Sequence, residues 1–210
     1  MKLYIKGDFT KEIPFDYLEL AKRMWFENYQ GEGILLSYSG FLQIRDRNDI
    51  AIHLKLDKQD YDERWLHVPI QEGIKYRFFS QIDEELNLDY EDAYVTDFRE
   101  NGDCLRLAST HLELLTLDKR AFYIMAIEIA TIFNGQISED DKKTWLTIEE
   151  FKEKHQDILS LTFDEANEMS LEEIQTIDAI DDPIWEELDR KREEYIKIHG
   201  EVELDEEEDD

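Results

Sequence analysis

Two hydrophobic periods alternate along the chain, and this alternation limits the fold more than any other feature of the sequence. Ile50–Leu56 has an apolar residue at every second position, which indicates a strand with one buried face and one wet face. Lys119–Phe133 instead places Phe122, Met125 and Ile129 at spacings of three and four, which is typical of a helix with a buried stripe. A chain with both patterns in separate segments is expected to be an α+β protein, with antiparallel strands packed against helices.

The first quarter of the chain is expected to form a meander. Lys2–Lys6 alternates apolar and polar residues, and two further strand-like runs, Ile34–Ser39 and Phe41–Arg45, are separated by Gly40. Together with the alternating segment described above, these runs predict an antiparallel sheet. Phe15–Gln30 has helical spacing, and we expect this helix to lie across one face of the sheet.

The middle of the chain predicts one helix and one hairpin. Apolar residues recur at every fourth position over Ile70–Leu86, as on the buried side of a helix. Two strand-like runs, Ala93–Phe98 and Cys104–Ser109, then flank the turn sequence Asn101-Gly102-Asp103. This arrangement predicts a second hairpin, because the turn residues tolerate positive φ.

Helix-start signals recur in the second half of the chain. Asp118 is the expected N-cap of the apolar helix, which should be the most buried one. Thr147-Ile-Glu-Glu150 has the spacing of a capping box, and Ser170-Leu-Glu-Glu173 repeats it. Before the first capping box, Gln136–Leu146 predicts a small hairpin, and after the second, Asp182-Pro183 predicts the start of a final helix. The C-terminal quarter is therefore expected to be helical.

The domain organisation follows from length and charge. We expect a single α+β domain over residues 1–200, with a subdivision near residue 115 as the alternative, and a disordered acidic tail over residues 201–210. The tail contains eight acidic residues and no basic one, so it repels itself in solution. No apolar run reaches the ~18 residues of a membrane span, and the first residues lack the pattern of a signal peptide. We therefore expect a cytoplasmic protein.

The formal charge of −29, from 53 acidic and 24 basic side chains, restricts the partners of this chain. Nucleic acids and anionic membranes are bound mainly by Lys and Arg, so neither is an expected partner. The negative electrostatic field of such a chain attracts basic protein surfaces and raises the rate at which they meet it. The alternative is that the acidity serves solubility alone.

The charge is concentrated in the last third of the chain. Residues 1–135 carry a net charge of −9, whereas residues 136–210 carry −20. This segment is the expected steering surface, including the acids of residues 164–194, and aromatic residues within it would be the anchors of an interface. The candidate binding residues are Asp140, Asp141, Trp145, Trp185, Glu186 and Glu187.

Motifs for catalysis or cofactor binding are missing from the sequence. It contains no HExxH, no GxSxG and no glycine-rich phosphate loop, so we expect no cofactor, no metal and no catalytic residue. The single cysteine, Cys104, is expected to be a small buried apolar residue. An enzyme remains the second hypothesis, as a metal-dependent hydrolase of unknown substrate that would use Asp89, Asp92 or His111. A permanent accessory subunit is the third.

One stretch resembles a known kind of protein. From Asp118 to Phe151 the chain has an apolar helix, Asn134-Gly135-Gln-Ile137, an acidic turn and then Thr144-Trp145-Leu-Thr-Ile-Glu-Glu-Phe151. This layout resembles that of immunity-type proteins of bacterial polymorphic toxin systems. The resemblance implies a cytoplasmic inhibitor that binds one toxin. It implies no particular site residues, because such proteins bind through variable surfaces.

Overall fold

The computed structural model describes residues 1–9, 11–26, 36–41, 51–68, 84–91, 104–110, 113–176 and 197. The chain divides into two units, residues 1–176 and residues 177–210, and only helical Lys197 of the second unit is described. The elements of the first unit are β1 (Lys2–Lys6), α1 (Tyr17–Trp25), β2 (Leu36–Phe41), β3 (Ala51–Leu56), η2 (Lys58–Asp60), η3 (Glu63–His67), β4 (Glu85–Glu91), β5 (Cys104–Ser109), α3 (Thr116–Ile132), β6 (Gln136–Ser138), α4 (Ile148–Lys154), α5 (Gln156–Leu159) and α6 (Phe163–Thr176).

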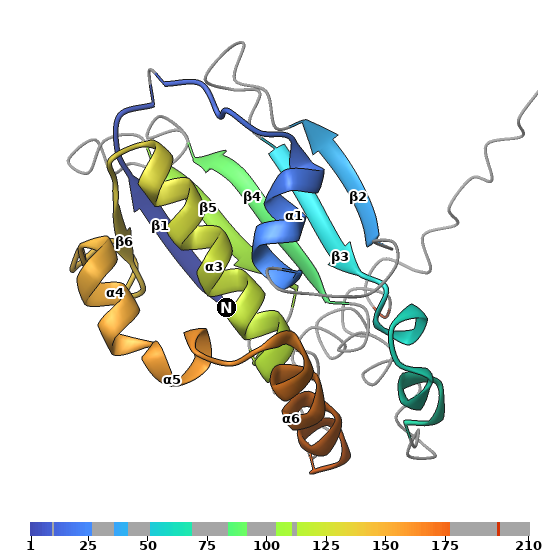
Figure 1. Cartoon of the computed structure of the whole chain (residues 1–210). Coiled ribbons are helices and arrows are strands. Elements are labelled where there is room, and N and C mark those ends of the chain that lie inside the picture. Colours follow the sequence, from blue (N-terminus) through green and yellow to red (C-terminus); the bar gives the residue numbers. More distant parts are fainter. Residues whose placement is uncertain are drawn as a thin grey trace, which may run out of the picture. The chain divides into compact units, whose positions relative to one another are not determined.

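The six strands form one antiparallel sheet in the order β2-β3-β4-β5-β1-β6. The first four follow the chain as a meander, and β1 then lies between β5 and β6. Both α1 and α3 lie across the same face of this sheet (Figure 1). The α+β class with an antiparallel sheet is therefore confirmed, but the observed meander is β2-β3-β4-β5, of which only β2 and β3 come from the segment where the sequence predicts one.

The core lies between that sheet face and the two helices. Ile52, Leu54 and Leu56 of β3 are buried, while His53 and Lys55 on the other face are partly exposed, as the alternating pattern predicts. Helix α3 is buried along most of its length and carries Phe122 into the core. Since apolar burial contributes about 25 cal/mol per Å², this layer holds the fold together.

Some predictions for the first half of the chain need correction. Gly40 does not separate two strands, because β2 runs through it and pairs with β3 as far as Phe41. The helix predicted over Ile70–Leu86 is wrong at its end, where Leu86 belongs to β4; residues 69–83 lie outside the described residues. Cys104–Ser109 forms β5 and pairs with β4 and β1, while its predicted partner Ala93–Phe98 lies outside the described residues.

Two predicted helix starts are also wrong. Asp118 does not cap α3, because the helix begins at Thr116 and Asp118 lies buried in its first turn, 2.8 Å from the Lys58 ammonium. Ser170 does not begin a helix either, since it is buried within α6. The capping signal that does begin α6 is Thr162 with Glu165.

Other predictions hold where they can be checked. Thr147 and Glu150 form the capping box at the start of α4. Ile137 of β6 pairs with Leu146, which closes the small hairpin. Helix α1 lies within the predicted Phe15–Gln30, but it ends at Trp25. The final helix predicted after Pro183 and the tail lie outside the described residues, apart from Lys197.

Candidate functional site: an acidic helical flank

The acidic turn after β6 is organised by Asp140. Its carboxylate accepts hydrogen bonds from the Thr144 backbone (2.8 Å), the Thr144 hydroxyl (2.6 Å) and the Ser138 hydroxyl (2.9 Å). These bonds, led by those from Thr144, hold the pKa of Asp140 at about 2 against an ordinary value of 3.8. The carboxylate that the sequence nominates for steering therefore shapes its own turn.

The other nominated residues fall into two groups. Asp141 is exposed in the same turn, with a φ of 55°. Trp145 is half-buried, and the Lys6 ammonium lies 4.5 Å from the centre of its ring, so a basic side chain of this chain already covers part of it. The remaining nominated residues lie outside the described residues: Trp185, Glu186 and Glu187.

The Glu139 carboxylate also has partners within the molecule. It accepts from the Lys154 ammonium at 2.5 Å and contacts His155 Nε2 at 2.8 Å. The His155 ring packs against Tyr123, with 4.2 Å between ring centres. Burial, together with the charges of Glu139 and Asp157, raises the pKa of Tyr123 to about 12. This cluster fastens α4 and α5 to α3.

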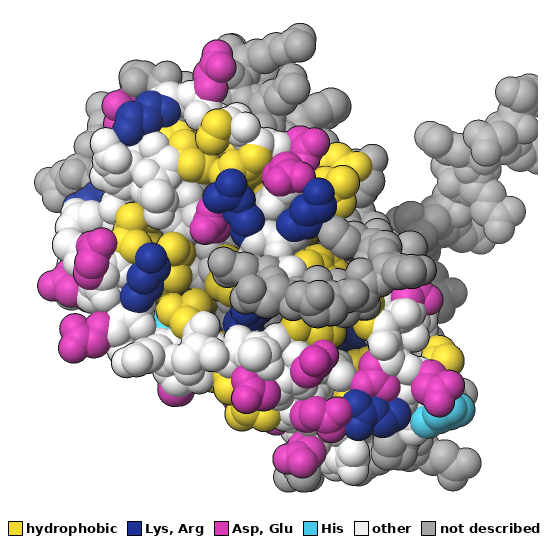
Figure 2. All heavy atoms as spheres, in the orientation of Figure 1, with side chains coloured by type: hydrophobic (Ala, Val, Ile, Leu, Met, Phe, Trp, Pro, Cys, Tyr) yellow, Lys and Arg dark blue, Asp and Glu magenta, His cyan; other side chains and the backbone are white. Residues whose placement is uncertain are grey.

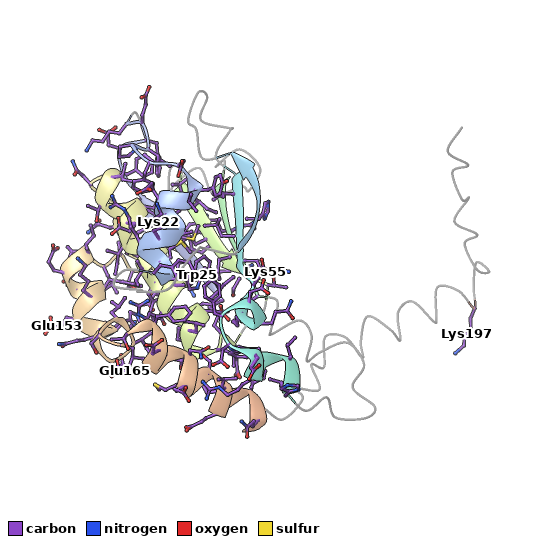
Figure 3. The ribbon with its side chains drawn as sticks, turned by 45° about the vertical axis from the view of Figure 1, so that its right-hand side comes forward. Lys22, Trp25, Lys55, Glu153, Glu165 and Lys197 are labelled. Carbon is purple, nitrogen blue, oxygen red and sulfur yellow. The ribbon has the colours of Figure 1, made fainter. Side chains whose placement is uncertain are left out.

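Further along the chain, the sequence is rich in acidic residues and poor in basic ones. Residues 155–189 contain twelve Asp or Glu and no Lys or Arg. In Figure 2 the acidic side chains collect along the lower part of the view, where Figure 1 places α6. Glu153 of α4 and Glu165 of α6 lie on the outer edge of the molecule, away from the buried Trp25 (Figure 3).

Five exposed carboxylates on α4, α5 and α6 have no hydrogen-bonding or ion-pair partner among the described residues. We call this set the acidic flank: Glu149, Glu153, Asp157, Asp164 and Glu172. Sequence reasoning nominated only its part within residues 164–194. The other three, Glu149, Glu153 and Asp157, are distinguished by their exposure on helices, and a count of charges does not reveal exposure.

Two pairs of carboxylates on the helices of the acidic flank repel each other, whereas Glu149 and Asp164 lie in first turns, where the helix dipole favours acids. Glu149 and Glu153 are four residues apart on α4, and Glu168 and Glu172 are four residues apart on α6. Like charges at this spacing destabilise a helix by about 0.2–0.5 kcal/mol per pair. Helix α6 also has no basic residue in its last turn, where the helix dipole favours one.

Helix α6 nevertheless holds its position because its inner side chains are bonded to the rest of the fold. Ser170 Oγ accepts from the Leu117 backbone N–H at 2.8 Å, and Glu173 accepts from the Thr116 backbone N–H at 2.8 Å. Both bonds satisfy N–H groups at the open start of α3. The inner face of α6 is thus structural, and its outer face is left to solvent.

Of the residues of the enzyme hypothesis, the structure places only Asp89. Asp89 lies in β4 and not in a loop, while Asp92 and His111 lie outside the described residues. Within the described residues no group of three or more His, Cys, Asp or Glu side chains could hold a metal ion. Cys104 is buried, as expected from the sequence.

Comparison with known proteins adds no functional assignment. No family model, no curated protein and no solved structure matches this chain. In the parts of the chain that the structure describes, no helix combines the length and apolar character needed to cross a bilayer. The function must therefore be argued from the site itself.

Proposed function

We infer that this chain is a non-enzymatic binding protein whose acidic flank neutralises a basic protein partner. The observation that carries this inference is the set of five exposed carboxylates with no cationic partner among the described residues. Opposite charge on a partner would relieve the repulsion within the flank and speed the encounter of the two proteins.

The partner that fits best is a toxin or nuclease with a positive cleft. Such a cleft normally holds nucleic acid through Lys and Arg, and the same side chains complement a carboxylate-rich surface. The resemblance of residues 118–151 to immunity-type proteins supports this assignment, and it also favours the cytoplasm as the place of action. A complex of this kind typically buries about 1,600 Å² in total.

Solubility alone accounts less well for the distribution of charge. A solubilising surface works best with both signs interspersed, because a large field of one sign repels itself. Here the acids are concentrated on consecutive short helices, and residues 155–189 have no intervening Lys or Arg.

The test is affinity capture from lysate of the source cells with two matched variants of the whole chain. The flank-neutral variant removes four charges of the acidic flank. It keeps Asp157, because the charge of Asp157 contributes to the raised pKa of Tyr123. It carries Glu149→Gln, Glu153→Gln, Asp164→Asn and Glu172→Gln. The control variant removes four exposed charges elsewhere: Glu12→Gln, Glu19→Gln, Asp60→Asn and Glu113→Gln.

We expect the wild type and the control variant to retain the same basic protein at low ionic strength and to release it as salt rises. The flank-neutral variant should retain far less of that protein. If the three proteins capture the same set, or if no captured protein is basic, the proposed function is wrong.

A further inference from the structure

We propose that the outer face of α6, with the adjoining η3, is the docking surface for an arginine-rich segment of the partner that also carries apolar side chains. This proposal rests on the proposed function and narrows it to one part of the molecule. It names the surface and the chemistry of the segment that covers it.

Apolar side chains distinguish this surface from the rest of the acidic flank. Among the described residues, the large hydrophobic side chains classed as exposed are Leu66 of η3 (61%) and Met169 of α6 (40%). Met169 lies four residues after Glu165 and three before Glu172, so all three share one helix face. Apolar anchors ringed by charge are the usual composition of a protein interface.

The surface is held rigid before any partner arrives. Trp65 Nε1 donates to Asn167 Oδ1 at 2.9 Å in a buried contact, and Asn167 Nδ2 donates to Asp62 at 2.8 Å. These bonds join η3 and its N-cap residue Asp62 to α6. A preorganised surface binds more tightly, because less conformational freedom is lost on association.

Arg64 shows which cation this surface accommodates. Its guanidinium donates from Nε to Asp62 at 2.9 Å, and from Nη1 to Glu168 at 3.0 Å with a second bond from Nη2 to the same carboxylate. Paired bonds of this type favour Arg over Lys, since the guanidinium fork matches a carboxylate. On the same helix, Asp164 and Glu172 have no such cation among the described residues.

Charge complementarity selects the occupant of this surface. A second copy of the chain would bring another −29 charges toward the acidic face, and a nucleic acid would bring phosphates. A segment of alternating arginine and apolar residues instead matches the carboxylates and the two apolar side chains together. The segment that covers this surface is therefore an arginine-rich segment of another protein.

The test uses a synthetic dodecapeptide of alternating Arg and Leu, titrated into the full-length chain and followed by fluorescence anisotropy at low salt. Three double variants are compared. The face variant carries Asp164→Lys and Glu172→Lys, the apolar variant carries Leu66→Ser and Met169→Ser, and the charge-matched control carries Glu149→Lys and Glu153→Lys on α4.

We expect the face variant to weaken binding about tenfold and the apolar variant about fivefold, while the α4 control changes it less than about twofold. A peptide in which every Arg is replaced by Lys and every Leu is kept should bind the wild type more weakly than the arginine peptide. Circular dichroism should show the folded spectrum in all variants, since every substituted side chain is exposed.

Each contrary result has a defined meaning. Equal losses in the face variant and the α4 control, or no loss in the apolar variant, would overturn the assignment of this surface while leaving the proposed function standing. No salt-sensitive binding of the peptide by any form would count against the proposed function itself. A wild-type dimer in sedimentation that Leu66→Ser dissociates would replace the partner segment with a second copy.

Discussion

Two sets of charged side chains in the described part of the molecule differ in what surrounds them. Lys58 and Asp118 are almost completely buried and lie 2.8 Å apart, and Glu173 accepts a hydrogen bond from the Thr116 N–H at the start of α3. The acidic flank, in contrast, consists of exposed carboxylates with no cation beside them in the described part of the chain. The contrast indicates that the first set stabilises the fold and that the second is available for recognition at some expense of helix stability.

The largest effect is expected at the buried ion pair. Lys58→Met would leave the Asp118 carboxylate buried without its ammonium, and we expect the free energy of unfolding to fall by about 3–5 kcal/mol. Urea unfolding followed by tryptophan fluorescence measures this change. The double variant Lys58→Met, Asp118→Leu should recover most of the loss, and a double variant as unstable as the single one would show that the charge of Asp118 is not the cause.

A smaller loss of stability is expected where Ser170 of α6 accepts a hydrogen bond from the first turn of α3. Ser170→Ala removes the acceptor for the buried Leu117 N–H, and an unsatisfied buried donor costs about 1–3 kcal/mol. Thermal unfolding should therefore show a clear fall in Tm. Gln175→Ala on the exposed side of the same helix is the control, and an equal fall in both variants would mean that the loss does not come from the contact with α3, because alanine itself favours a helix.

The acidic turn gives a prediction for pH dependence. Because the pKa of Asp140 in the folded protein is about 2, below its ordinary value of 3.8, its ionised form stabilises the fold at higher pH. That contribution is present above pH 3.8 and is lost as pH falls toward about 2. Asp140→Asn should therefore lower Tm at neutral pH and flatten the dependence of Tm on pH below 4. A variant with the same acid profile as the wild type would contradict this role.

The sequence predicts those parts of the fold that depend on neighbouring residues. Alternation located β3, and the spacing of Thr147 and Glu150 located the start of α4, because both signals lie within one short segment. The same reasoning failed at Asp118 and Ser170. Their partners, Lys58 and the Leu117 N–H, are more than fifty residues away along the chain, so no local pattern reveals them.

The candidate site was predictable only in its charge. Counting residues indicated an acidic C-terminal third, but it could not separate carboxylates bonded within the molecule from those left open. Asp140 and Glu172 look equivalent in sequence. Asp140 accepts three hydrogen bonds from Ser138 and Thr144, while Glu172 stands exposed on α6.

The most direct test of this distinction is the free energy of unfolding, in urea at low salt, of the double variant Glu153→Gln, Glu172→Gln, which changes flank carboxylates outside the first turns of α4 and α6. The two substitutions relieve the like-charge pairs Glu149 with Glu153 and Glu168 with Glu172, and they leave in place the first-turn acids that the helix dipole favours. We predict that the variant is more stable than the wild type by about 0.4–1 kcal/mol, and that the gain shrinks at high salt. A variant less stable than the wild type would show that the acidic flank supports the fold, which would contradict its assignment to recognition.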